Sequence, residues 1–521
     1  MKTTDYDRIS SKLLHFSNIF IKTAGIVIFL FLLWYSMRFT DYEKSGGDET
    51  LLIRQDSVIV NLLAALLLSV FFCGLPYLRR FAKLIPVVTT VWFAVCCIWW
   101  IAGGDRPPQA DPAVICEGVA QMMQGNYSFF EMGQYFHMYP HQLGLAASIE
   151  LMFHLFGAGN YLSLQIVNGL MAIALFLLGY FMVKELTEQS SIASFAIKAP
   201  SLYCLLMCGC FPLIFYTTWI YGEIPFLFFS FLAALCLLRY EKNGNSFYLM
   251  IMLLSAALAV IVRQNAWIMV IALGLVLGVH LLVNRKWKLL VLLPLLVLLP
   301  LSFQGTINKV YEMRAGQDIS EGIPAQAWIA MGMQEGIWNY GWYNQYGVSV
   351  YWEKEFDLDL VEETAAADIR NRLQTFAKAP SYAALFYREK LLTQWNTPLY
   401  QSLFFNTAFG DNVPEEGTLL YDICFGKGMN RILWLSDRMQ FLIYFGILLY
   451  FILSVRKDSN ILHHLFGVAL IGYFLFSILW EGKARYIFPC YVMMFPLAAI
   501  GWARGIYVCR RALFSYFHRV N

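Results

Sequence analysis

The chain has 521 residues, of which 59% are hydrophobic, 17% aromatic and only 14% charged. Together with a mean hydropathy of +0.55, this composition excludes an ordinary soluble globular protein and indicates a polytopic membrane protein. The net charge of +3 is too small on so long a chain to favour a nucleic-acid partner.

Apolar runs long enough to cross a bilayer recur along the whole chain. A helix needs about 20 apolar residues to span the hydrocarbon core. The first run lacks a small-residue cleavage site and is too long for a signal-peptide core, so it is expected to remain as a span. We expect an all-α bundle of about twelve spans, near 17–37, 57–78, 83–102, 160–183, 200–218, 222–238, 246–262, 266–283, 288–304, 437–455, 461–480 and 486–506.

One further candidate, "HQLGLAASIELMFHLFG" at 141–157, is short and carries His141, Glu150 and His154. Polar groups of this kind are costly in hydrocarbon, so the segment is expected to lie in the membrane interface. Basic residues mark cytoplasmic loops, and the clusters at 79–83, 285–288 and 510–519 then agree with two cytoplasmic termini. That agreement requires that 141–157 does not cross.

This topology divides the chain into three parts. Residues 1–304 are expected to form an N-terminal transmembrane module whose first outer loop covers 103–159. Residues 305–436 form one extracellular insertion, mixed or mostly helical, and 437–521 form the last spans with a short basic cytoplasmic tail. The stretch "EGIWNYGWYNQYGVSVYW" in the insertion provides either an aromatic surface for sugar rings or the insertion's own core.

The first outer loop opens with "GGDRPPQADP", which contains Asp105 and Asp111. Its three prolines keep the backbone extended, so the loop can fix a carboxylate at the membrane surface. The alternative is that both are solvated loop acids of the ordinary kind.

Cationic residues that could bind a phosphate lie in later parts of the chain. Arg485, with Lys483 beside it, lies at the outer mouth of the last span, where a guanidinium can bind phosphate through two hydrogen bonds. The alternatives are contacts to lipid headgroups or a salt bridge from Arg485 to Glu481. Arg263 and Glu223 also lie at membrane depth and provide either a functional pair or a structural ion pair.

The stretch "YFHMYPHQ" brings His137, Tyr139 and His141 into the same outer loop. Two histidines four residues apart can share a metal on a helix, but Pro140 between them argues against an ordinary helix. An aromatic belt at the interface is the other interpretation.

Several short motifs resemble one family. An Asp near the start of a large first outer loop, "YPHQLG", "FGAGNY" and a terminal "E...RY..P" are similar to motifs of the GT-C superfamily of membrane glycosyltransferases. The likeness is to family 39, protein O-mannosyltransferase-like members of the Gram-positive bacterial type. It covers the membrane portion, 1 to about 300 and about 437 to 506.

The resemblance implies an inverting transferase in the plasma membrane, with its active site on the extracellular face. Its donor would be a polyprenyl-phosphate sugar, and its acceptor a cell-wall glycopolymer, glycolipid or protein. Asp111 matches the family's acidic catalytic residue, which would accept the proton of the acceptor hydroxyl, with Asp105 as the rival. The implied donor-phosphate ligands are Arg485, Lys483 and Arg263, and Glu223, His137, Tyr139 and His141 would orient the acceptor. Some relatives use a divalent cation such as Mg²⁺ or Mn²⁺, which this sequence neither requires nor excludes.

Two other classes of protein fit the same composition. A transporter or flippase for a lipid-linked saccharide would also have many spans, although it would place ionisable groups near the membrane midplane. A non-catalytic partner in saccharide assembly would need no acid at Asp111.

Overall fold

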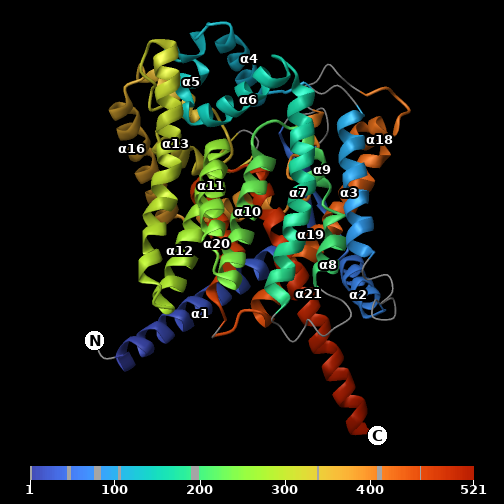
Figure 1. The fold of residues 1–521 in the computed structure, drawn as a ribbon. Helices are drawn as coiled ribbons and strands as arrows, with labels where there is room; N and C mark the ends of the chain where they lie inside the picture. The colour runs from blue at the N-terminus through green and yellow to red at the C-terminus, as the bar shows by residue number, and fades with distance from the viewer. Residues whose placement is uncertain are drawn as a thin grey trace.

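The structure is a computed structural model that describes residues 3–43, 49–74, 84–103, 107–188, 199–336, 339–407, 414–457 and 459–520. The described chain is almost entirely helical, as the sequence predicts, and most of its long helices run side by side in one bundle (Figure 1). The bundle helices are α1 (Thr3–Ser36), α2 (Val58–Gly74), α3 (Ile85–Ala102), α7 (Tyr161–Glu188), α8 (Ala199–Met207), α9 (Phe211–Phe215), α10 (Glu223–Asn243), α11 (Phe247–Val262), α12 (Trp267–Val283), α13 (Leu292–Ala315), α19 (Lys427–Leu453), α20 (Leu465–Leu479) and α21 (Ala484–Val520).

Every apolar run predicted as a span contains a helix or a helix pair. Within the described residues, nine helices are long and apolar enough to cross a membrane, or ten if the bent pair at 199–218 is one span. The helical stretches Val58–Phe71 and Phe247–Val262 are apolar but shorter, which accounts for the difference from the twelve expected. The chain is a multi-pass membrane protein.

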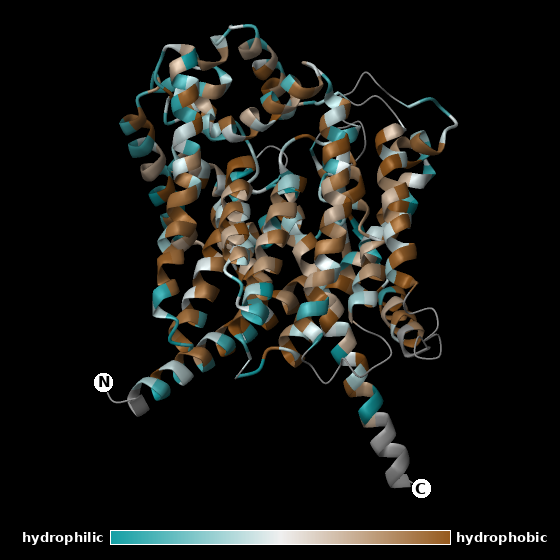
Figure 2. Ribbon diagram, in the orientation of Figure 1, coloured by the Kyte–Doolittle hydropathy of each residue, from teal (hydrophilic) through white to brown (hydrophobic). Residues whose placement is uncertain are grey.

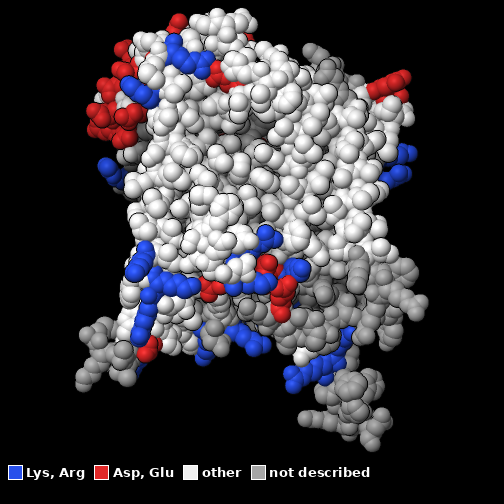
Figure 3. All heavy atoms as spheres, in the orientation of Figure 1, with Lys and Arg blue, Asp and Glu red and all other residues white. Residues whose placement is uncertain are grey.

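Both termini lie at the same end of the bundle (Figure 1). Apolar residues predominate along the middle of the helices (Figure 2), and Lys and Arg side chains form a band across the visible face near the termini (Figure 3). Near the other end, α21 begins at Ala484, and 94% of its most apolar window is buried inside the protein. α21 is therefore a central helix, surrounded by protein rather than lipid.

α19 and α21 pack closely because glycines face each other across their contact. A Cβ atom added to Gly501 would lie 1.9 Å from the carbonyl oxygen of Gly446, so no larger residue fits without separating the helices. Small residues at such positions are the usual means by which membrane helices approach closely.

Short helices cover the end of the bundle opposite the termini (Figure 1). The first outer loop provides α4 (Asp111–Met123), α5 (Tyr135–Met138) and α6 (Leu143–Phe156). The segment predicted to lie in the interface is α6, which lies beside α4 and α5 at this end. Its Glu150 accepts hydrogen bonds from Tyr311 Oη at 2.7 Å and from the guanidinium of Arg314 at 2.6 and 3.0 Å. These bonds tie α6 to the end of α13.

The long insertion is also largely helical. Its helices are α14 (Ala325–Gly332), α15 (Tyr346–Glu353), α16 (Leu358–Lys378), α17 (Pro380–Trp395) and α18 (Leu419–Phe425). α14, α15 and α16 share a small core of their own around Ala327, Tyr351 and Ala365, each of which is fully buried. α17 instead packs against the spans, because Trp395 Nε1 donates to Ser477 Oγ on α20 at 3.0 Å.

Two strands, which the sequence analysis did not predict, follow α1. β1 (Phe39–Glu43) and β2 (Leu51–Gln55) pair antiparallel, with Phe39 opposite Gln55 and Glu43 opposite Leu51. Asn396, just beyond α17, donates to the Phe39 carbonyl at 2.8 Å. The hairpin therefore joins the first span to the insertion.

Replacing Glu150 with Gln should destabilise the protein, because the Glu150 side chain is only 8% exposed and its charge would be lost. Its carboxylate accepts two hydrogen bonds from Arg314 and one from Tyr311. We expect the free energy of unfolding to fall by about 2 kcal/mol. Thermal denaturation of the purified protein measures the change. Glu312→Gln, which breaks the more exposed Lys309 pair on the same helix α13, is the control and should have little effect. Equal losses in both variants would contradict this role for Glu150.

Candidate functional site

Four helix ends meet at the end of the bundle opposite the termini. Asp111 begins α4, Glu223 begins α10, Arg263 follows the last residue of α11, and Arg485 is the second residue of α21. α10 can approach α11 because Gly222 precedes it with a φ of +89°. A Cβ at this glycine would lie 2.4 Å from the Val262 carbonyl oxygen. The backbone at this turn thus places Glu223 beside Arg263.

Glu223 lies between two guanidinium groups. Its Oε1 is 3.0 Å from Arg263 Nη1 and 3.9 Å from Arg485 Nε, and the Glu223 side chain is 1% exposed. The ion pair considered from the sequence between Glu223 and Arg263 is therefore present. The salt bridge considered between Arg485 and Glu481 is replaced by the contact to Glu223. Since one carboxylate faces two guanidiniums, this group of three side chains has a net charge of +1.

Tyr221 connects this charged group to Asp111. Its hydroxyl donates to Asp111 Oδ2 at 3.0 Å and accepts from Gln142 Nε2 at 2.9 Å. Arg263 Nη1 donates to the Tyr221 carbonyl oxygen at 2.8 Å. The guanidinium carbons of Arg263 and Arg485 lie 5.2 and 4.7 Å from the centre of the Tyr221 ring. A single aromatic side chain therefore contacts the carboxylate and both arginines.

The link between α20 and α21 adds a second group of charges. Lys483 Nζ is 3.0 Å from both carboxylate oxygens of Glu49, which precedes β2. Tyr486 Oη donates to Glu481 Oε2 at 3.4 Å. Burial raises the pKa of Glu481 to about 7, although Lys483 and Arg485 lower it; Glu49 and Asp111 raise it further. Glu481 is thus a second carboxyl group near Asp111, and it holds its proton close to neutral pH.

The insertion holds this link in place through backbone contacts. Gly482 N–H donates to the Gly341 carbonyl at 2.7 Å, and Arg485 N–H donates to Gln401 Oε1 at 3.2 Å. Lys390 on α17 donates to the carbonyl oxygens of Ile478 at 2.9 Å and Gly332 at 2.5 Å. Burial lowers the pKa of this lysine to about 7. The backbone that carries Glu481, Lys483 and Arg485 is therefore fixed by the insertion.

The residues of the "YFHMYPHQ" stretch divide between two neighbourhoods. His137 faces the insertion, where its Nδ1 lies 3.4 Å from Tyr351 Oη. His141 Nε2 lies 3.4 Å from Gln142 Nε2, the amide that also binds Tyr221. Burial raises the pKa of Tyr139, and the nearby Tyr343, Asp111 and Glu481 raise it further. We call Asp111, Glu223, Arg263 and Arg485 the charged cluster. Tyr139 and His141 lie near it, whereas His137 does not.

Two other predicted features, the pair of loop aspartates and the aromatic stretch of the insertion, lie partly outside the described residues. Asp105 lies outside the described residues, as does Trp338 of the aromatic stretch. Trp342 is buried, and its Nε1 donates to Thr393 at 3.0 Å, so it belongs to the insertion's packing. Tyr346 donates to Asp368 on α16 at 2.6 Å. Tyr343 lies beside the link between α20 and α21, with Lys483 Nζ 5.5 Å from its ring centre.

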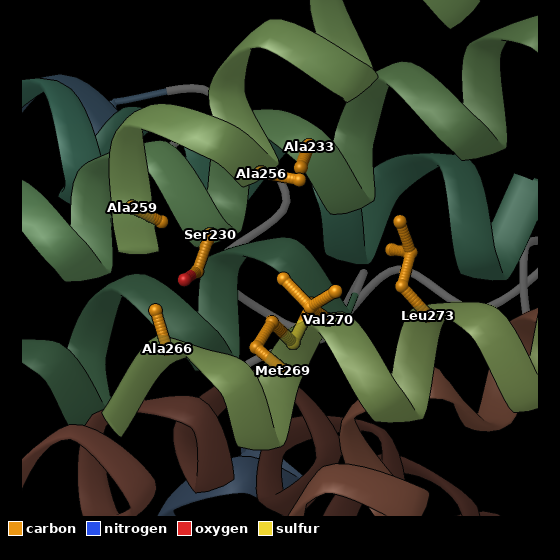
Figure 4. Close-up of a pocket in the computed structure, with 8 residues that line it drawn as sticks. All are labelled: Ser230, Ala233, Ala256, Ala259, Ala266, Met269, Val270 and Leu273. Atoms are coloured by element: carbon orange, nitrogen blue, oxygen red, sulfur yellow. The ribbon is translucent and has the colours of Figure 1, made fainter. Parts of the chain in front are cut away.

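The described residues contain no group of three or more His, Cys, Asp or Glu side chains that could hold a metal ion. A small cavity lies among α10, α11 and α12, lined by Ser230 and by small or flexible apolar side chains (Figure 4). Ser230 is seven residues beyond Glu223 on α10, and the cavity volume of about 10 Å³ suits at most one water molecule. This space is too small for a lipid tail.

Sequence reasoning did not identify Tyr221, Gln142 or Glu49 as members of the site. Tyr221 was visible only as part of "WIYGEIP", next to a glutamate at membrane depth. Its hydrogen bond to Asp111 joins residues far apart in the chain, and no local pattern reports such a bond. Glu49 lies in a short polar stretch between two spans, which gave no signal at all.

Comparisons with known proteins add little to this geometry. No family model matches the chain, and no curated protein matches it. Among solved structures, it is similar to ArnT from Cupriavidus metallidurans, solved bound to undecaprenyl phosphate. The sequence identity is 13%, the match covers 81% of this chain and 78% of that chain, and the TM-score is 0.32. A likeness at this level assigns no activity to the chain.

The Glu481 carboxyl should make stability depend on pH. Its pKa rises from an ordinary 4.5 to about 7 in the folded protein, so between these values the folded state binds a proton that the unfolded state does not. Stability should therefore fall as pH rises from about 4.5 to about 7, by roughly 3 kcal/mol from this group. Thermal denaturation measured at several pH values should show a smaller loss of stability over this interval for Glu481→Gln than for wild type. Glu362→Gln on the exposed face of α16 should keep the wild-type slope, and parallel profiles in all three proteins would contradict the assignment.

Proposed function

We propose that the chain is a GT-C-type membrane glycosyltransferase that moves a sugar from a polyprenyl phosphate to an extracytoplasmic acceptor with inversion at the anomeric carbon. The observation that carries this proposal is the connection of Asp111, through Tyr221, to two arginines that share one carboxylate. A base and a phosphate-binding pair of cations are the two parts that such a transfer needs. Both are at one end of the bundle.

In the proposed reaction, the acceptor hydroxyl oxygen attacks the anomeric carbon on the face opposite the phosphate. The bond between that carbon and the phosphate oxygen breaks, and its electron pair leaves with the lipid phosphate. Asp111 accepts the proton of the attacking hydroxyl. Hydrogen bonding from Tyr221 holds the carboxylate in one orientation while it accepts the proton. The attack from the opposite face inverts the anomeric configuration.

The arginines would stabilise the charge that develops on the leaving phosphate. Arg263 Nε and Arg485 Nε are both buried and have no hydrogen-bond partner among the described residues. Buried donors of this kind are costly unless a ligand binds them, and phosphate oxygens suit a guanidinium. Glu223 would fix both arginines before the substrate arrives, so that little reorganisation is needed during the reaction. Lys483, paired with Glu49, contributes a weaker positive field.

The site would face the outside of the plasma membrane. The basic band near the termini supports a cytoplasmic location for that end, which makes the opposite end extracellular (Figure 3). The polar groups of the site lie at helix ends opposite the termini rather than midway along the helices, which favours a transferase over a transporter. The acceptor would then be an extracellular cell-wall glycopolymer, glycolipid or protein.

Asp111→Asn should fold normally but lose transfer, because the amide cannot accept the proton. Asp105→Asn should retain part of the wild-type rate. The measurement is sugar transfer from radiolabelled polyprenyl-phosphate hexoses by purified proteins, with membrane extract as the source of acceptor. Loss of transfer only in Asp105→Asn would move the base to that residue. If folded wild-type protein turned over none of the donors, transport or saccharide assembly would become the better interpretation.

Arg485→Lys should reduce the rate of sugar transfer by about 100-fold, because an ammonium group cannot form the bidentate hydrogen bonds that a guanidinium forms with phosphate. The same radiolabelled donors measure the rate. Arg370→Lys, on the exposed side of α16, provides a matched control that should keep the wild-type rate. A normal rate in Arg485→Lys would exclude Arg485 as the main phosphate ligand.

A further inference from the structure

A second candidate binding site lies at the end of the bundle that carries both termini. A cavity of about 400 Å³ is formed by α1, the last turn of α19 and the link that follows α19. Three cationic side chains line it, those of Lys22, Arg456 and Lys457, together with apolar side chains such as Ile19 and Leu453. None of its lining residues, all within the described part of the chain, is acidic. The cavity therefore favours an anion.

Asn18 lines this cavity and ties α1 to the link that follows α19. Its Nδ2 donates to the carbonyl oxygens of Lys457 at 3.2 Å and Ser459 at 2.9 Å, which fixes the orientation of the amide. Its Oδ1 is buried and has no hydrogen-bond partner among the described residues. The two bonds from Nδ2 hold the backbone that carries Lys457 against α1.

Lys22 is held at the cavity in a defined position. Its Nζ donates to the Ile452 carbonyl oxygen at 3.0 Å, near the end of α19. An ammonium group has three N–H donors, so this bond leaves two for a ligand. A cation fixed by the protein loses less entropy on binding an anion than one on a freely moving side chain.

An apolar surface adjoins the cations. Phe16, Ile19 and Phe20 on α1 are 69%, 41% and 56% exposed, and Ile452 on α19 is 42% exposed. Residues three and four apart lie on the same side of a helix, so the three α1 side chains form one apolar strip. Ile19 belongs both to this strip and to the cavity lining. A ligand there would meet positive charge at one end and apolar surface at the other.

We propose that this cavity binds the headgroup of an anionic membrane phospholipid. The phosphate would lie between Lys22, Arg456 and Lys457. The acyl chains would run from there along α1 toward the middle of the bundle, over the exposed side chains of Phe20, Val27 and Leu30. A free phosphate ion shares the charge but makes no use of these apolar side chains. This site is separate from the charged cluster at the other end and does not depend on the function proposed there.

Native mass spectrometry of the purified full-length protein tests the proposal. The protein is mixed with equal amounts of phosphatidylglycerol and phosphatidylcholine that have the same acyl chains, and the retained lipids are counted. Each cation near a headgroup changes affinity by about fivefold, so wild type should retain phosphatidylglycerol strongly. Lys22→Gln/Arg456→Gln should retain the two lipids almost equally. Lys288→Gln/Arg511→Gln removes the same charge from the same end, outside the cavity, and should keep the wild-type preference.

A second double variant tests the same cavity without removing the hydrogen bond between α1 and α19. Arg456→Gln/Lys457→Gln alters only exposed side chains, leaves the Lys22 bond to α19 in place, and should also weaken the preference. Equal retention of both lipids by wild type, or the same loss in the Lys288→Gln/Arg511→Gln control, would overturn the proposal. Displacement of phosphatidylglycerol by millimolar inorganic phosphate would show that the cavity binds a free anion, and the lipid assignment would then be wrong.

Discussion

The arrangement of the charged end depends on one buried carboxylate that faces two guanidiniums. Glu223 is almost completely removed from solvent, and an isolated charge in that position would cost several kcal/mol. Arg263 and Arg485 offset this cost only when α10, α11 and α21 are all in their native positions. The same contacts place both arginines against Tyr221 and, through its hydroxyl, next to Asp111. Packing of the spans and construction of the site are therefore one process.

The insertion belongs to this site rather than covering it as an independent lid. Gly341 and Gln401 bind the backbone on either side of Lys483, and Lys390 binds the last turn of α20. A Cβ on Gly332 would lie 2.6 Å from the Trp480 carbonyl, so the two segments are in direct backbone contact. The insertion and the backbone that carries Arg485 are thus held together by hydrogen bonds on both sides of Lys483.

The sequence predicted those parts of the structure that depend on local composition. Apolar runs located the spans, and α6, set apart from them by the cost of Glu150 in hydrocarbon, is not among the described helices that are long and apolar enough to cross a membrane. The pairing of Glu223 with Arg263 was one of the two options considered. Partners separated by long stretches of chain were not predictable, because nothing local selects Glu49 for Lys483, or Tyr221 for Asp111. The β1–β2 hairpin was also missed, since its strands have five residues each and show no clear alternation. The roles of Asp111, Arg485 and their neighbours in catalysis stay predictions.

The position of Arg485 at the start of the last span has a consequence for biogenesis. A chain that is inserted into the membrane as it is synthesised would present Glu223 and Arg263 to the bilayer long before Arg485 leaves the ribosome. Until then, Glu223 has Arg263 as its partner without Arg485, and the space that α21 later fills between α19 and α8 has no protein in it. The charge balance of the site and the centre of the bundle are therefore completed together, by the last span to be made.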